Sequence, residues 1–267
     1  MMRKSIRSAQ VAGMFYPANP DELRGQISGF IHEKPNETTG VPKALIVPHA
    51  GTVYSGSIAA VAYRTLLQCR HVIRKVILLG PAHRVYLHGL ALPGVEQFQT
   101  PLGKINLDTK TIQKLVDNFH QITFSDAAHA EEHSLEVQLP FLQVVLASFR
   151  LIPFVVGDAT QQEVAEVIEY LWGGDECLII ISTDLSHFHK YEEAVKIDKT
   201  SAELIESFQG DRLGDNSACG RIPMRGLLHL AQQKGMSIKR LDLRNSGDTS
   251  GRRDQVVGYG AWGLFEL

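Results

Sequence analysis

The sequence predicts an α/β fold, a single domain with a mostly parallel central sheet and helices on both faces. Short, uninterrupted apolar runs alternate with longer segments whose apolar residues recur at helical spacing, and such runs are typical of parallel strands buried on both faces. No repeat, low-complexity tract or shift in composition divides the 267 residues. We therefore expect one domain over residues 1–267.

Composition limits the class of protein. Hydrophobic residues make up 44% and charged residues 21% of the chain, and the formal net charge is −2. A nucleic-acid partner, which usually requires a basic face, is therefore not expected. The three cysteines form no CxxC pair, which argues against a disulfide framework and favours a reducing compartment. Because no secretory signal or apolar run of ~20 residues is present, we expect a cytoplasmic protein without a membrane partner.

The N-terminal half alternates helix and strand. A short helix at 20–31 and a polar loop at 32–43, which contains proline and glycine, precede the apolar strand "ALIVP" at 44–48. Apolar residues at helical spacing predict a helix at 55–68, with Ser55 or Ser57 as its N-cap. The remaining elements of this half are strands at 75–80 and 89–93 and a helix at 108–119 that Asp108 caps.

The C-terminal half continues the alternation. A helix is expected at 132–148, and Pro140 should kink it or end it early because proline lacks a backbone N–H. The β-branched run "CLIIIS" at 177–182 predicts a buried strand. The other expected elements are strands at 150–157, 236–244 and 256–267 and helices at 160–173, 191–208 and 222–234.

Histidines follow three of the predicted strands. His49 comes directly after 44–48, His83 follows the strand at 75–80, and His187 follows the strand at 177–182. In open α/β sheets, ligands bind outside the carboxyl ends of the strands. We therefore expect these imidazoles, which are far apart along the chain, to meet in one pocket at a shared edge of the sheet.

Two further polar segments supply candidate site residues. The segment 129–133 carries two acids and two histidines, more than the first turn of a helix needs, and we include His133 among the candidate catalytic residues. The loop at 244–260 contributes Asp248 as a candidate carboxylate ligand, and its glycines match neither a phosphate-binding loop nor a dinucleotide fingerprint. Cys219 has no base beside it in the sequence, so we expect it to be structural.

These residue types predict a metal site with a base nearby. Two imidazoles and one carboxylate that leave open positions suit Fe(II) and oxygen chemistry, and imidazole also binds Zn and Cu. A histidine that does not bind the metal can act as a general acid or base. His187 is the candidate for this role, with Asp184 as its orienting partner.

Several motifs, spread in order over nearly the whole chain, resemble the Memo family, also called AmmeMemoRadiSam system protein B. They are "GMFYP", "VPHAGxxYSG" (47–56), "GPAH" (80–83), "EEHSLEVQLPFL" (131–142), "STDLSH" (182–187), "ACG" (218–220) and the C-terminal "NSGD" with "VGYG". Because several independent motifs match, the resemblance is far more specific than any one of them.

The resemblance implies a fold similar to that of class III non-haem iron extradiol dioxygenases. It implies that His49 and His83 bind the metal and that His187 takes the place of the dioxygenase acid/base. In animal members of the family the third ligand is a cysteine shortly before the last strand. In this chain that place falls at or next to Thr249, and Asp248 is the nearest residue that can bind a metal.

We therefore expect a divalent metal, with Fe(II) favoured and Cu or Zn as alternatives. Its expected ligands are His49, His83 and Asp248, and the expected catalytic residues are His187, Asp184 and His133. The first functional hypothesis is a non-haem iron dioxygenase or oxidoreductase that acts on a small molecule. The alternatives are a non-enzymatic module that binds a small molecule or a phosphorylated peptide in a vestigial site, and a metal-assisted hydrolase.

Overall fold

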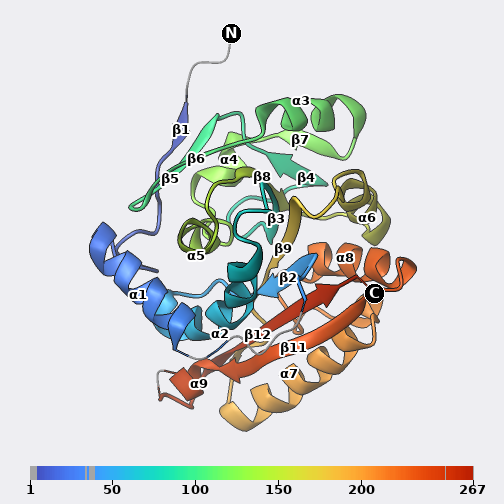
Figure 1. Ribbon diagram of the computed structural model, residues 1–267. Coiled ribbons are helices and arrows are strands. Elements are labelled where there is room, and N and C mark those ends of the chain that lie inside the picture. Colours follow the sequence, from blue (N-terminus) through green and yellow to red (C-terminus); the bar gives the residue numbers. More distant parts are fainter. Residues whose placement is uncertain (1–4, 34, 36–39, 250, 267) are drawn as a thin grey trace.

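The computed structural model describes residues 5–33, 35, 40–249 and 251–266 and shows an α/β fold built around one large sheet (Figure 1). The strands are β1 (Ile6–Arg7), β2 (Ala44–Val47), β3 (Lys75–Pro81), β4 (Leu90–Leu92), β5 (Gln97–Thr100), β6 (Gly103–Asn106), β7 (Ile122–Phe124), β8 (Arg150–Val156), β9 (Cys177–Ser182), β10 (His187–His189), β11 (Ser237–Asn245) and β12 (Val256–Phe265). The helices are α1 (Pro20–His32), α2 (Thr52–Arg64), α3 (Thr109–Asn118), α4 (Asp126–Ala130), α5 (Leu139–Val145), α6 (Gln161–Tyr170), α7 (Tyr191–Glu206), α8 (Arg221–Gln233) and α9 (Ser246–Thr249). The α/β class is confirmed. The expected loop at 32–43 and strand at 256–267 lie partly outside the described residues.

The large sheet is mixed, with a parallel centre. Its strand order is β10-β12-β2-β9-β3-β8-β4-β7, and β11 pairs with β12. The four central strands, β2, β9, β3 and β8, run parallel to one another, whereas β12 is antiparallel to β2 and β4 is antiparallel to β8. The parallel arrangement expected from the sequence therefore holds for the centre of the sheet and not for its flanks.

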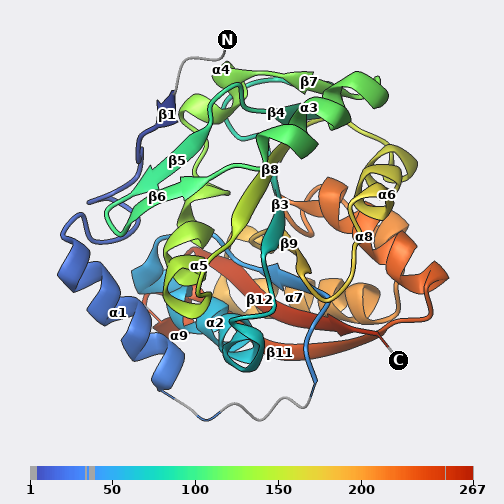
Figure 2. The same cartoon turned by 45° about the horizontal axis from the view of Figure 1, so that its top comes forward.

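Helices cover both faces of the large sheet. α1, α2 and α5 pack together on one face, and α6, α7 and α8 lie on the other (Figure 1). A small second sheet of β1, β5 and β6 lies at the opposite end of the molecule from β11 (Figure 2). The buried side chains form one continuous core, and every residue of β2 and β9 belongs to the buried interior.

None of the helices in the described part of the chain has the length and apolar character that a membrane-spanning segment requires.

Two helix starts differ from the expectation. α2 begins at Thr52 with Gly51 as its N-cap and without a side-chain cap, so neither Ser55 nor Ser57 caps it. Pro140 lies in the first turn of α5. A backbone N–H at this position has no acceptor within the helix, so its absence in proline costs no hydrogen bond. Pro140 thus begins a short helix and does not kink a long one. Asp108 caps α3 as expected.

Glu136 fastens the N-terminal segment to the body of the protein. This buried carboxylate accepts hydrogen bonds from Arg7 Nη1 (2.6 Å), Tyr16 Oη (2.6 Å) and the backbone N–H groups of Gln10 and Val11 (2.9 Å each). A buried ion pair is tolerated only where its remaining hydrogen-bonding positions are satisfied, and this one meets that condition. The segment from Arg7 to Tyr16 is thereby held against the loop that precedes α5.

The polar segment 129–133 divides between the core and the edge of the sheet. His129 is 2% exposed, and its Nε2–H donates to the carbonyl oxygen of Ala91 at 3.0 Å. Its Nδ1 has no hydrogen-bond partner among the described residues. Burial lowers the pKa of His129 to about 4, so this residue is a neutral core histidine.

We expect His129 to make the stability of the fold depend on pH. Below pH ~6.5 the unfolded chain binds a proton here that the folded chain excludes, so stability falls on acidification by up to about 1.4 kcal/mol per pH unit. His129→Gln keeps a donor for Ala91 and cannot titrate. Urea unfolding at pH about 6.5 and about 5 should show a loss of stability that is smaller in the variant by about 1.5 kcal/mol. Equal losses in both proteins would contradict the neutral assignment.

Candidate metal centre

Three histidines meet at the carboxyl edge of the parallel strands. His49 follows β2, His83 follows β3, and His133 lies in the loop between α4 and α5. One nitrogen of each ring lies within 4.8 Å of those of the other two, and the ring centroids are 4.6, 5.2 and 5.4 Å apart. Two nitrogens that each lie ~2.1 Å from one ion are at most ~4.2 Å apart. Small ring movements therefore suffice for the three residues to hold one metal ion.

Glu132 sets the orientation of His83. Its Oε1 lies 2.8 Å from His83 Nδ1 and accepts the backbone N–H of Ser134 at 2.9 Å, and its Oε2 accepts the backbone N–H of His83 at 2.7 Å. Burial alone would raise the pKa of Glu132, but the hydrogen bonds from His83 bring it down to about 2. The carboxylate therefore receives Nδ1–H, and Nε2 of His83 is left to face a metal, as in carboxylate–histidine–metal arrangements.

Ser182, the last residue of β9, fixes the tautomer of His49. The hydroxyl of Ser182 donates its single hydrogen to the carbonyl oxygen of Ser134 at 2.6 Å. Its oxygen can then only accept from His49 Nδ1, which lies 2.9 Å away. His49 thus carries its hydrogen on Nδ1, and its Nε2, which lies 3.4 Å from Cys219 Sγ, carries the lone pair.

Gln138 completes this buried network. Its Nε2 donates to Ser182 Oγ at 2.7 Å and to the carbonyl oxygen of Pro48 at 2.9 Å, while its Oε1 accepts from Tyr63 Oη at 2.8 Å. All of these side chains are almost inaccessible to solvent. Each partner has one consistent role as donor or acceptor, so the proton positions around His49 are determined by the fold.

His133 completes the donor set. Its Nδ1 is buried, makes no hydrogen bond within the described residues and lies 3.5 Å from Glu132 Oε1. The ring of Phe15 lies against it with centroids 4.9 Å apart. Burial, assisted by the neighbouring histidines, lowers the pKa of His49 to about 3 and that of His133 to about 4. These residues are neutral near pH 7, as metal ligands must be.

A cavity of about 650 Å³ reaches the histidine group at His133. Its wall includes Phe15, His133, Asp184, His187, Phe188 and Tyr259. His187 Nδ1 donates to the carbonyl oxygen of Leu185 at 2.8 Å, which leaves Nε2 of His187 as a free acceptor.

The sequence suggested Asp184 as the residue that orients His187, but the hydrogen bond to His187 Nδ1–H is made by the carbonyl oxygen of Leu185. Asp184 Oδ1 accepts the backbone N–H groups of His49 at 2.7 Å and of Ala50 at 3.3 Å. Burial raises the pKa of Asp184. Asp184 therefore holds the turn that carries His49, and it also lines the cavity.

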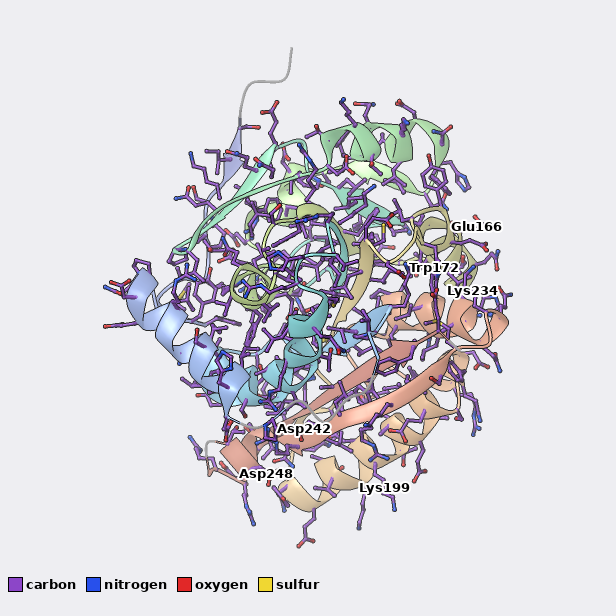
Figure 3. The ribbon with its side chains drawn as sticks, in the orientation of Figure 1. Glu166, Trp172, Lys199, Lys234, Asp242 and Asp248 are labelled. Carbon is purple, nitrogen blue, oxygen red and sulfur yellow. The ribbon has the colours of Figure 1, made fainter. Side chains whose placement is uncertain are left out.

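Asp248, the expected third ligand, is not part of the histidine group. Its Oδ1 accepts from Tyr191 Oη at 2.7 Å and its Oδ2 accepts the backbone N–H of Asn245 at 3.0 Å. Figure 3 shows Asp248 at the periphery of the molecule, where β11 ends. One carboxylate oxygen thus holds the start of α7 and the other holds the end of β11, and His133 supplies the third imidazole in the group.

Cys219 lies closer to the site than its sequence context indicates. Its Sγ is 3.4 Å from His49 Nε2 and 3.3 Å from the backbone nitrogen of Asp184. Burial, together with the charge of Asp184, raises the pKa of Cys219 to about 12, so the side chain is a thiol near pH 7. No local motif marks this proximity, because Cys219 precedes α8 and reaches His49 only through the fold.

We expect Ser182→Ala to release the tautomer of His49. Without the hydroxyl, Nδ1–H has no acceptor, and the Nε2–H form becomes populated. Long-range ¹⁵N–¹H NMR of the metal-free protein measures the two forms. Ser55→Ala is the matched control, because Ser55 is also buried but donates to the carbonyl oxygen of Ala50. A spectrum of Ser182→Ala that retains only Nδ1–H would contradict the assignment.

Comparison with solved structures shows similarity of fold. The protein described as an uncharacterized protein JW3007 from Escherichia coli K12 superposes with a TM-score of 0.57 at 11% sequence identity, over 82% of this chain and 99% of that one. At this identity the similarity is one of architecture alone.

Comparison of sequences covers almost the whole chain. The family model described as Memo-like protein matches residues 7–262. The chain is 33% identical to the MEMO1 family protein TV1383 of Thermoplasma volcanium over 95% of this chain and 96% of that one. It is also 33% identical to a MEMO1 family protein of Aquifex aeolicus, over 95% and 97% of the two chains. The resemblance noted from the motifs is confirmed, and the chain belongs to the Memo family.

Proposed function

We propose that this protein is a metal-dependent oxidoreductase that uses dioxygen to oxidise a small molecule, with Fe(II) as the favoured metal. The observation that carries the proposal is the pairing of two features that adjoin one cavity, which His133 and His187 both line. One is a group of three imidazoles with ligand nitrogens within 4.8 Å, and the other is His187, whose Nε2 is a free acceptor. Imidazole ligands that leave open coordination positions suit Fe(II), Zn and Cu.

His49, His83 and His133 would hold the ion. When bound, the ion supplies Lewis acidity and, in the case of iron, one-electron chemistry with dioxygen. Because an imidazole that binds a metal is neutral, three such ligands would leave the positive charge of the ion undiminished, which favours a substrate with an anionic oxygen.

His187 would take the proton from the substrate. Its Nε2 lone pair accepts a hydroxyl proton, while Nδ1–H remains on the carbonyl oxygen of Leu185 and steadies the imidazolium. That transfer would take place beside the apolar part of the cavity wall, which includes Phe15, the residue that packs on His133.

A hydrolase is the second candidate. Three histidines are also the donor set of zinc enzymes that activate water, and the same base then serves water in place of a substrate hydroxyl. A binding module without turnover is the remaining outcome of the tests below.

Metal binding should depend on the three histidines and on the residue that orients one of them. Isothermal titration of metal-free protein with Fe(II) without oxygen, and with Zn(II), measures it. Glu132→Gln should lower affinity by ~10–100-fold, and alanine at His49, His83 or His133 should lower it further. His88→Ala is the control, because that side chain is 74% exposed and lies outside the group. Unchanged affinity in the ligand variants would refute a site here.

Turnover should require His187, while metal binding should not. In an oxygen electrode, the Fe(II)-loaded protein should consume oxygen with a member of a panel of catechols and aminophenols. His187→Ala should lower kcat by ~10²–10⁴ while the iron content is unchanged. Hydrolysis of esters by the Zn-loaded protein without oxygen uptake would favour the second candidate. Ligand binding without either reaction would favour the binding module.

A further inference from the structure

Two consecutive residues of β10, His187 and Phe188, line the same cavity. In a regular strand, successive side chains point to opposite faces of the sheet, so two neighbours reach one cavity only where this alternation is interrupted. The interruption is present: the φ angle of Phe188 is +62°, and the pairing with β12 shifts register between His187 and His189.

Folding stability does not account for this arrangement. A left-handed backbone is a rare and costly conformation for a bulky residue. The side chain of Phe188 is also 69% exposed, so it adds little to the core. Its ring lies beside that of His187, with centroids 5.7 Å apart and planes inclined at 66°. Strained residues that the surrounding structure maintains are concentrated at ligand sites.

We propose that Phe188 is a specificity-determining residue that receives the flat face of an unsaturated ring in the substrate, next to Nε2 of His187. Phe15, Tyr54 and Val257 supply further apolar wall in the same cavity. Aromatic faces attract one another in offset or edge-to-face arrangements beyond the area they bury, which a saturated ring cannot reproduce. The ligand class is therefore a planar conjugated ring with a polar substituent directed at His187. The expectation that the ligand is turned over depends on the proposed function, whereas the expectation that it binds depends on this geometry alone.

Phe188→Gly removes the aromatic ring and keeps the backbone conformation. Glycine adopts positive φ without strain, so the variant should melt at or above the temperature of the wild type while losing the stacking surface. Phe188→Tyr keeps the ring and should bind as the wild type does. Phe208→Gly is the matched control, because Phe208 is the other non-glycine residue with positive φ (57°) in the described part of the chain and lies outside the cavity wall.

Two probe ligands test recognition of a planar ring. Catechol and cyclohexane-1,2-diol carry the same pair of hydroxyl groups on a flat and a saturated ring. NMR titration of metal-free protein measures their dissociation constants, so the result does not depend on metal binding or turnover. Phe188→Gly should weaken catechol binding by ~3–10-fold and leave the diol unchanged. If the iron-loaded protein is active, KM for catechol should rise by the same factor while kcat changes little.

Several results would overturn the inference. One is that Phe188→Gly binds catechol as tightly as the wild type does, or that the substitution weakens the binding of catechol and of the diol equally. Another is that Phe188→Gly melts below the temperature of the wild type. A third is that the metal-free wild type does not bind catechol at all. Weaker catechol binding in Phe208→Gly would also count against it. Absence of oxygen uptake alongside the expected binding ratio would refute the proposed function and leave Phe188 as the recognition residue.

Discussion

The backbone register of the parallel strands is the constraint on which the site depends. Val47 of β2 pairs with Ser182 of β9, and Leu79 of β3 pairs with Ile181, so the strands end at nearly the same height. His49, His83 and Asp184 each lie two residues beyond the end of a strand. The hydrogen-bonded ladders of three buried strands therefore set the distances between side chains that are 34 to 135 residues apart in the sequence, because a slip in register would move every one of them.

The proton positions of the site follow from the same framework. Ser182, still within β9, gives its hydrogen to the loop carbonyl of Ser134 and so must accept from His49. Glu132, in that loop, receives Nδ1–H of His83. The loop that contains Glu132 and Ser134 is thus linked to the sheet and orients the rings of both His49 and His83. Burial keeps His49 and His133 neutral. For His49 and His133, no proton therefore has to be displaced when a divalent ion binds.

The sequence predicted the parts of this arrangement that depend on local patterns. Apolar runs marked the central strands, and the histidines after them indicated the edge at which His49 and His83 meet. His133 was recognised as chemically unusual, but its place among the three histidines depends on a loop held by Arg7 and Glu136, a contact across more than a hundred residues. Asp248 lies near the position of a family ligand, but its carboxylate accepts hydrogen bonds from Tyr191 Oη and from the backbone N–H of Asn245. Strands such as β5 and β7 are too short to show a period of two.

The irregular backbone of β10 is a feature that the sequence pattern does not predict. A regular strand presents every second residue to one face, so a cavity wall built from it receives alternate side chains. The side chains of two successive residues, His187 and Phe188, reach one cavity only where this alternation is broken. The left-handed conformation of Phe188 is that break, and no local preference of phenylalanine predicts it. A sequence otherwise consistent with its fold departs from local rules mainly at functional sites. The positive φ of Phe188 and the interrupted alternation that brings it and His187 to one cavity therefore support the proposal that both residues serve a ligand.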